Sequence, residues 1–196
     1  MSLTPASSHR ASKRVGSGAL LGAVALVVLA APAHAQDVLT KDSAAAIKAA
    51  FLADIETMRG KYIPLAEAFP ADKFTWRPME GVRSVSEVLM LIASEGYGFA
   101  PQALGGKPAM SREEAQKLSA VTEKAQVIQH LTKGFAYAKQ AIEAIDPATL
   151  VGRRSVFGRE RTMPDVVLFV DGDMHEHLGQ LIAYARMNRI VPPWSK

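Results

Sequence analysis

"IQHLTKGFAYAKQAIEAI", residues 128–145, carries the clearest structural pattern in the chain. The spacing of its apolar residues alternates between three and four along Ile128, Leu131, Phe135, Ala138, Ile142 and Ile145. Because an α-helix completes a turn every 3.6 residues, this spacing puts all of them on one face. The pair Asp146-Pro147 then ends the element, since proline cannot continue a helix. The stretch therefore predicts a helix with one face buried in a core.

The same periodicity predicts a long helix earlier in the chain. Its apolar face is formed by Ile47, Phe51, Ile55, Met58, Tyr62, Leu65 and Phe69. Pro64 interrupts this pattern and should kink the last turns. A second helix is expected from about Val85 to Leu104, because Ser84 and Glu87 form the capping-box pattern that opens a helix.

The last predicted helix runs from Pro164 to Asn188. Before it, "LVGRRSVFGRERTMP", residues 150–164, combines glycines with mixed charge and predicts a surface loop or a short hairpin. Four long amphipathic helices with little strand signal are typical of a four-helix bundle. We therefore expect an all-α, up-down four-helix bundle with a kinked first helix and a loop or short hairpin before the last helix.

The N-terminal residues have the three parts of a secretory signal peptide. A basic start is followed by an apolar run over residues 18–31, and "APAHAQ" then places Ala33 and Ala35 at the small-residue positions of a cleavage site. We expect residues 1–35 to be a signal peptide, residues 36–196 to be the mature domain, and the protein to be periplasmic or secreted. The alternative is an uncleaved anchor, although the apolar run is short for a membrane span.

Charge and cysteine content exclude several classes of function. The chain has 23 Lys and Arg against 19 Asp and Glu, and 20 basic residues remain once Arg10, Lys13 and Arg14 leave with the predicted signal peptide. A net charge near +1 gives no electrostatic footprint for nucleic acid. The absence of cysteine excludes disulfides and thiol chemistry.

The segment "DGDMHEH" near the C-terminus carries the strongest chemical signal. On a helix, Asp173 and His177 share one stripe with Gln180, and this stripe borders the apolar face. His175 points about 200° away from Asp173, so the two histidines cannot share one site. Two interpretations of the Asp173–His177 pair remain open. It is half of a metal or acid–base site, or it is a structural histidine oriented by a carboxylate.

Two longer stretches resemble the DinB-like superfamily. They are "FTWRPMEGVRSVSEVLMLIASEGYGF", residues 74–99, and "HEHLGQLIAYARMNRIVPPWS", residues 175–195. The resemblance implies a four-helix bundle that commonly holds one divalent metal with three histidines. One of these histidines comes from the second helix, and two come from the fourth helix at i, i+4.

The ligand set that the resemblance implies is altered in this chain. His177 matches one ligand of the fourth helix, Asp173 stands in place of the other, and Leu91 stands at the position on the second helix. Glu95 lies one turn beyond Leu91 on the same face. The candidate metal ligands are therefore His177, Asp173 and Glu95, a mixed set for one divalent metal such as Zn, Mn, Fe or Ni. The alternative is a metal-free site.

Two hypotheses of function follow from these observations. The first is an exported small-ligand- or metal-binding bundle, in the class of metal-dependent hydrolases or transferases of unknown substrate. The alternative is a non-catalytic periplasmic bundle that acts through protein contacts or as a homodimer. Neither hypothesis involves nucleic acid, and neither involves a membrane once the signal peptide is cleaved.

Overall fold

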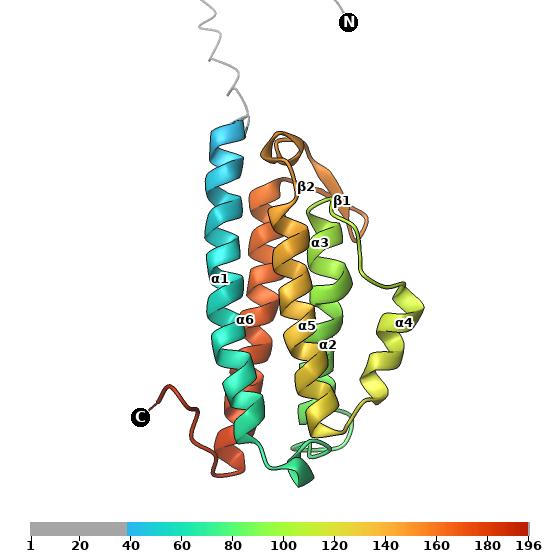
Figure 1. Ribbon diagram of the computed structural model, residues 1–196, viewed down its shortest axis with the longest axis vertical. Helices are drawn as coiled ribbons and strands as arrows, with labels where there is room; N and C mark the ends of the chain where they lie inside the picture. Colours follow the sequence, from blue (N-terminus) through green and yellow to red (C-terminus); the bar gives the residue numbers. More distant parts are fainter. Residues whose placement is uncertain (1–38, 196) are drawn as a thin grey trace, which may run out of the picture. The chain divides into compact units, whose positions relative to one another are not determined.

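Four long helical segments lie side by side in the computed structural model, which describes residues 39–195 (Figure 1). They are α1 (Lys41–Ala68), the segment that begins with α2 (Val85–Ser94), α5 (Lys124–Glu143) and α6 (Met163–Met187). The prediction of a mostly helical fold is confirmed. Each long helix forms where apolar residues recur at spacings of three and four.

Shorter elements extend and connect these segments. After α2 the chain continues without a break through a π-helix, η2 (Glu95–Phe99), into α3 (Ala100–Ala103). The remaining short helices are η1 (Ala71–Lys73), α4 (Arg112–Lys117), η3 (Leu118–Ala120) and η4 (Pro147–Leu150). Strands β1 (Arg154–Val156) and β2 (Arg159–Arg161) pair antiparallel before α6, so the predicted short hairpin is confirmed.

The long segments do not alternate in direction as an up-down bundle requires. Lys124, at the start of α5, donates to the carbonyl oxygen of Phe69 just beyond the end of α1, so α1 and α5 are antiparallel. Tyr137, late in α5, donates to the carbonyl oxygen of Lys107 just beyond α3, so the α2–α3 segment and α5 run in the same direction (Figure 1). The predicted up-down order is therefore corrected. The link over residues 105–123, which includes α4, is long enough to return along the bundle, and this allows two successive long helices to be parallel.

The core lies between the four long segments and uses the faces that the sequence predicts. On α5 the side chains of Leu131, Phe135 and Ile142 are buried. Along α1 and its end the buried residues of the predicted face are Phe51, Ile55, Met58, Tyr62, Leu65 and Phe69. Pro64 does not end α1, which continues to Ala68. The rings of Tyr62 and Phe135 lie 5.7 Å apart and join the two faces.

Two glycines bring η2 close to α5. A Cβ atom at Gly96 would lie 2.6 Å from the carbonyl oxygen of Gly134, and one at Gly134 would lie 2.6 Å from the carbonyl oxygen of Ala93. Backbones approach this closely only where no side chain intervenes, which requires glycine at both positions. The contact lies within the π-helix that begins at Glu95, and π-helical turns of this kind recur at functional sites.

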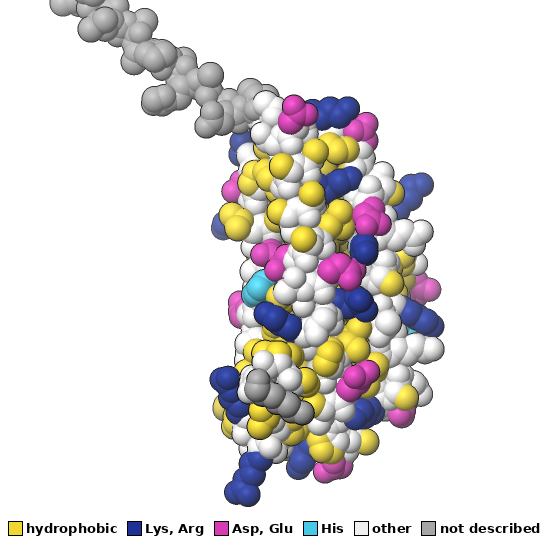
Figure 2. Space-filling model, turned by 60° about the vertical axis from the view of Figure 1, so that its left-hand side comes forward, with side chains coloured by type: hydrophobic (Ala, Val, Ile, Leu, Met, Phe, Trp, Pro, Cys, Tyr) yellow, Lys and Arg dark blue, Asp and Glu magenta, His cyan; other side chains and the backbone are white. Residues whose placement is uncertain are grey.

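The surface is charged but balanced on the face that Figure 2 shows. Lys and Arg side chains are interspersed there with Asp and Glu side chains (Figure 2). Within residues 39–195, no helix is both long enough and apolar enough to cross a membrane. The predicted signal peptide, residues 1–35, lies outside the described residues.

Candidate functional site

A chain of hydrogen bonds fixes the orientation of His177 on α6. The Tyr184 hydroxyl donates to the carbonyl oxygen of Arg83 at 3.0 Å, so it must accept the bond that Gln180 Nε2 donates at 2.8 Å. This turns Gln180 Oε1 toward His177 Nδ1, at 2.9 Å. Because an amide oxygen only accepts, Nδ1 carries the proton, and the neutral imidazole keeps its lone pair on Nε2. Trp76 packs edge-on against Tyr184 and ties the chain to the connector before α2.

The lone pair of His177 faces a carboxylate without a hydrogen-bond partner. His177 Nε2 and Asp173 Oδ2 are 3.8 Å apart, which is too far for a hydrogen bond. Asp173 Oδ2 is shielded from solvent and has no hydrogen-bond partner. A buried oxygen without a partner is costly, so this gap is suited to a proton or a cation.

Glu95 brings a second carboxyl group to Asp173 from the start of η2. Burial, together with the negative charge of Asp173, raises the pKa of Glu95 to about 9, and the charge of Arg83 opposes this rise only in part. At neutral pH the Glu95 carboxyl therefore holds a proton. Hydrogen bonding between the Glu95 and Asp173 carboxyl groups also raises the pKa of Glu95, so the two groups are close neighbours.

Tyr62 borders these groups from α1. Its hydroxyl donates to the carbonyl oxygen of Met174 at 2.6 Å and is buried. Burial, and then the charges of Glu95 and Asp173, raise the pKa of Tyr62 far above its ordinary value. The phenol is therefore a fixed neutral neighbour and not a source of charge.

The structure brings together the three residues that the sequence singled out. We call Glu95, Asp173 and His177 the inner cluster. They form a row with Asp173 in the middle, and their ligand atoms do not all lie within 4.8 Å of one another. His177 is 9% exposed, whereas the side chain of His175 is 47% exposed. The two histidines therefore lie on different faces of α6.

A second group of ligand-type residues lies on the outer side of α6. Asp54, Asp171 and His175, here called the outer cluster, offer ligand atoms that all lie within 4.8 Å of one another, so this group could hold a metal ion. His175 Nε2 is 3.0 Å from Asp54 Oδ2. Burial and the neighbouring Asp54 raise the pKa of Asp171 to about 6.

The outer cluster was not predicted from the sequence, which indicated only that His175 cannot share a site with His177. Asp171 and His175 have the same i, i+4 spacing as Asp173 and His177, so half of the cluster was visible in the sequence. Asp54 was not, because it comes from α1 and no local pattern relates it to α6.

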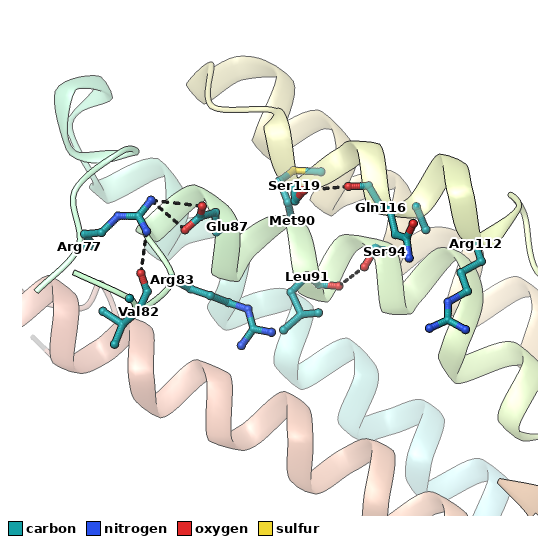
Figure 3. Close-up of a pocket in the computed structure, with 12 residues that line it drawn as sticks. Arg77, Val82, Arg83, Glu87, Met90, Leu91, Ser94, Arg112, Gln116 and Ser119 are labelled. Atoms are coloured by element: carbon teal, nitrogen blue, oxygen red, sulfur yellow. Dashed lines mark hydrogen bonds and ion pairs between the residues drawn. The ribbon is translucent and has the colours of Figure 1, made fainter. Parts of the chain in front are cut away.

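An open cavity of about 580 Å³ lies between the connector, α2 and α4 (Figure 3), and the residues of the inner cluster are not among those that line it. Its lining includes Leu91 and Ser94, the latter directly before Glu95 in the chain. Arg83 links the two sites, because its carbonyl oxygen ends the hydrogen-bond chain from His177 and its side chain lines the cavity. The charge of the same Arg83 side chain also lowers the pKa of Glu95, so the cavity and the inner cluster are connected through this arginine.

The helical bundle thus holds one buried histidine beside two half-buried carboxyl groups. Residues 54–181 match the family model of the DinB superfamily, which covers more than half of the chain. The chain therefore belongs to the DinB superfamily. We found no match to it among curated proteins.

The side chains of the inner cluster are of the types that bind divalent cations, although their ligand atoms do not all lie within 4.8 Å of one another. Asp173 Oδ2 is a buried oxygen without a partner, His177 presents Nε2, and Glu95 adds a second carboxyl group. One nitrogen with carboxylate oxygens suits Zn, Mn or Fe(II). Leu91, at the position of the superfamily's histidine on the second helix, supplies no ligand.

Proposed function

We propose that the inner cluster binds one divalent cation and that the protein is a metal-dependent hydrolase or transferase acting on a small molecule in the adjoining cavity. One observation carries this proposal. The chain from Arg83 through Tyr184 and Gln180 holds the proton of His177 on Nδ1 and leaves Nε2 facing the partnerless Asp173 Oδ2. Metal-binding histidines are characteristically held in this way, with the other ring nitrogen donating to an oxygen.

Each residue of the inner cluster has a distinct part in this proposal. His177, Asp173 and Glu95 would hold the cation, and a cation bound there supplies Lewis-acid polarisation of a substrate oxygen or of water. Glu95 must release its proton to become a ligand, so binding should liberate protons and strengthen as pH rises. Gln180 and Tyr184 keep the imidazole in place through their hydrogen bonds.

Calorimetric titration of Zn and Mn into the metal-free protein tests the proposal. The wild type should bind one ion. The variant Gln180→Ala, which removes a partner that supports a ligand, should bind the ion roughly 10- to 100-fold more weakly. The variant His177→Ala, which removes a ligand itself, should lose more affinity than that. His175→Ala is the matched control, because it removes an imidazole from the same helix but from the outer cluster.

The control also separates the two clusters. Unchanged binding by His175→Ala supports the inner cluster as the site. A loss confined to His175→Ala would assign the ion to the outer cluster and overturn the proposal. Failure of the wild type to bind any ion would leave His177 as a structural histidine.

A second candidate function is a non-catalytic bundle that acts through protein contacts, for example as a homodimer. It is supported by an exposed apolar area near the hairpin. Phe157 is 71% exposed and Phe169 is 37% exposed, and Phe157 contacts both Phe99, at 5.2 Å between ring centroids, and Phe169, at 5.7 Å. Phe157 also has a φ of 50°, which is unfavourable for a bulky residue. The second candidate function would be supported if the wild type binds no metal and is dimeric in solution.

A further inference from the structure

Two arginines point into the cavity beside α2 from opposite sides. Arg83 extends from the connector and Arg112 from the start of α4, and their guanidinium groups lie on either side of Leu91 and Ser94 (Figure 3). Among residues 39–195, neither side chain forms a hydrogen bond or an ion pair. The volume of about 580 Å³ is within the usual range for a small-molecule site.

The acidic residue that lines the cavity does not neutralise these arginines. Glu87 accepts from the backbone N–H of Ser84 at 2.6 Å and from Arg77 at 3.2 Å. These bonds, and the charge of Arg77, hold the pKa of Glu87 below its ordinary value, so it is charged but already paired. Both terminal nitrogens of Arg77 also have partners, because the second one donates to the carbonyl oxygen of Val82 at 2.9 Å.

The acidic residues that follow Arg112 also have other partners. Glu113 pairs with Lys117 at 3.0 Å, one turn along α4. Glu114 accepts from the backbone N–H of Ser111 at 2.7 Å as part of the capping box of α4. The cavity therefore has an excess of positive charge from Arg83 and Arg112.

The rest of the lining would suit the organic part of a ligand. Leu91 and Met90 provide an apolar wall from α2, and Ala115 faces them from α4. Gln116 adds a side-chain amide on the side of the cavity where Arg112 lies (Figure 3). Guanidinium groups recognise carboxylate and phosphate oxygens through paired hydrogen bonds, whereas an apolar wall favours a hydrocarbon body over water.

We propose that this cavity binds a small organic anion, with a carboxylate or phosphate group held between Arg83 and Arg112 and an apolar part packed on Leu91. The inference that such an anion is the substrate rests on the proposed function of the inner cluster. Binding itself needs no cation there, because both arginines belong to the connector and α4.

Titration with simple probes at low ionic strength tests the proposal. Phenyl phosphate and benzoate should bind the full chain with a Kd on the order of 1 mM or tighter, and benzyl alcohol, which has no charge, should not. Arg83→Gln and Arg112→Gln should each weaken binding about tenfold or more, and the double variant should abolish it. Arg159→Gln, an exposed arginine of β2, is the matched control and should bind like the wild type. The thermal midpoint of each variant checks that it is folded.

The probes also decide the chemistry of the ligand. Stronger binding of phenyl phosphate than of benzoate would assign a phosphate group, and the reverse would assign a carboxylate. Inorganic phosphate binding as tightly as phenyl phosphate would overturn the apolar part of the proposal. The whole proposal would be overturned if the wild type bound no anion, or if Arg112→Gln bound the anions as tightly as Arg159→Gln does.

Repeating the titration with His177→Ala separates this inference from the proposed function. Unchanged anion binding there supports a cavity that works independently of the cation. If metal fails to bind while the anions still bind, the proposed function fails alone. If the anions fail while metal binds, only the present inference fails.

Discussion

At the scale of single residues, Glu95 should make stability depend on pH. Its pKa rises from the ordinary value of 4.5 to about 9 because burial and Asp173 disfavour the charged form. Between these two values the folded protein therefore binds more protons than the unfolded chain. The free energy of unfolding of the metal-free protein should fall as pH rises through this window, because stability falls wherever the folded state binds more protons.

The variant Glu95→Gln should remove most of this fall. The amide is neutral at every pH, so the variant should be more stable than the wild type at pH 8 by at least about 1.4 kcal/mol, the equivalent of one pKa unit. Urea unfolding at several pH values in the presence of a chelator measures the slope. Glu113→Gln, an exposed carboxylate paired on α4, should leave the slope as in the wild type. Equal slopes for the wild type and Glu95→Gln would contradict the prediction.

The sequence predicted part of the candidate site, and the limit lies in contacts between helices. Asp173 and His177 are local partners, since one turn of one helix brings them together. Glu95 was predicted as a ligand because it lies one turn beyond Leu91. The position of Leu91 was itself singled out only through the resemblance to the superfamily. Asp54 and Arg112 could not be predicted, because each reaches its cluster or cavity from a different element, and no spacing along the chain records that arrangement.

At the scale of elements, the Gly96–Gly134 contact should control how α2 and η2 pack on α5. A methyl group at Gly134 would meet the backbone of Ala93 at 2.6 Å, and backbone atoms cannot rotate aside as a side chain can. The two helical segments would have to separate, which would open the core around Phe135 and shift Glu95 from Asp173. The cost should resemble that of overpacking a core, which is about 1–3 kcal/mol.

The variant Gly134→Ala should therefore lower the free energy of unfolding, although alanine favours helices over glycine. Gly60→Ala is its matched control. Gly60 also lies inside a long helix, but a Cβ atom there would meet nothing within 4 Å. That change should stabilise the protein by roughly 0.5–1 kcal/mol through helix propensity alone. Chemical denaturation of both variants measures the change in the free energy of unfolding relative to the wild type. An increase in both variants would show that the close contact at Gly134 can accommodate a methyl group.

Element types were easier to predict than their details. The long helices followed from apolar periodicity and caps, because these signals lie within each segment. The π-helix after Ser94 did not, since no apolar spacing or cap in the sequence distinguishes it from the α-helix that it continues. The parallel direction of α2 and α5 also escaped prediction. The link between them contains α4, and its length alone allows either direction.

At the scale of the whole molecule, the fold begins close to the predicted cleavage site. The described residues, 39–195, belong to one compact unit, and α1 starts at Lys41 with the Thr40 side chain accepting from the backbone N–H of Ser43. Cleavage after Ala35 would leave this cap and every described element in place. We therefore propose that the mature protein starts at Gln36 and is periplasmic or secreted.

Mass spectrometry of the protein recovered from the exported fraction tests this start. The expected N-terminus is Gln36, because signal peptidases select small residues at the positions of Ala33 and Ala35. Ala35→Leu should block cleavage and cause the uncleaved chain to accumulate. Ala31→Leu, which lies at the end of the apolar run, should be processed like the wild type. The domain over residues 36–196 should have the same thermal midpoint as the full chain, since the described core lies entirely within it. An intact Met1 start in the exported fraction, or protein confined to the cytoplasm, would rule out a cleaved signal peptide.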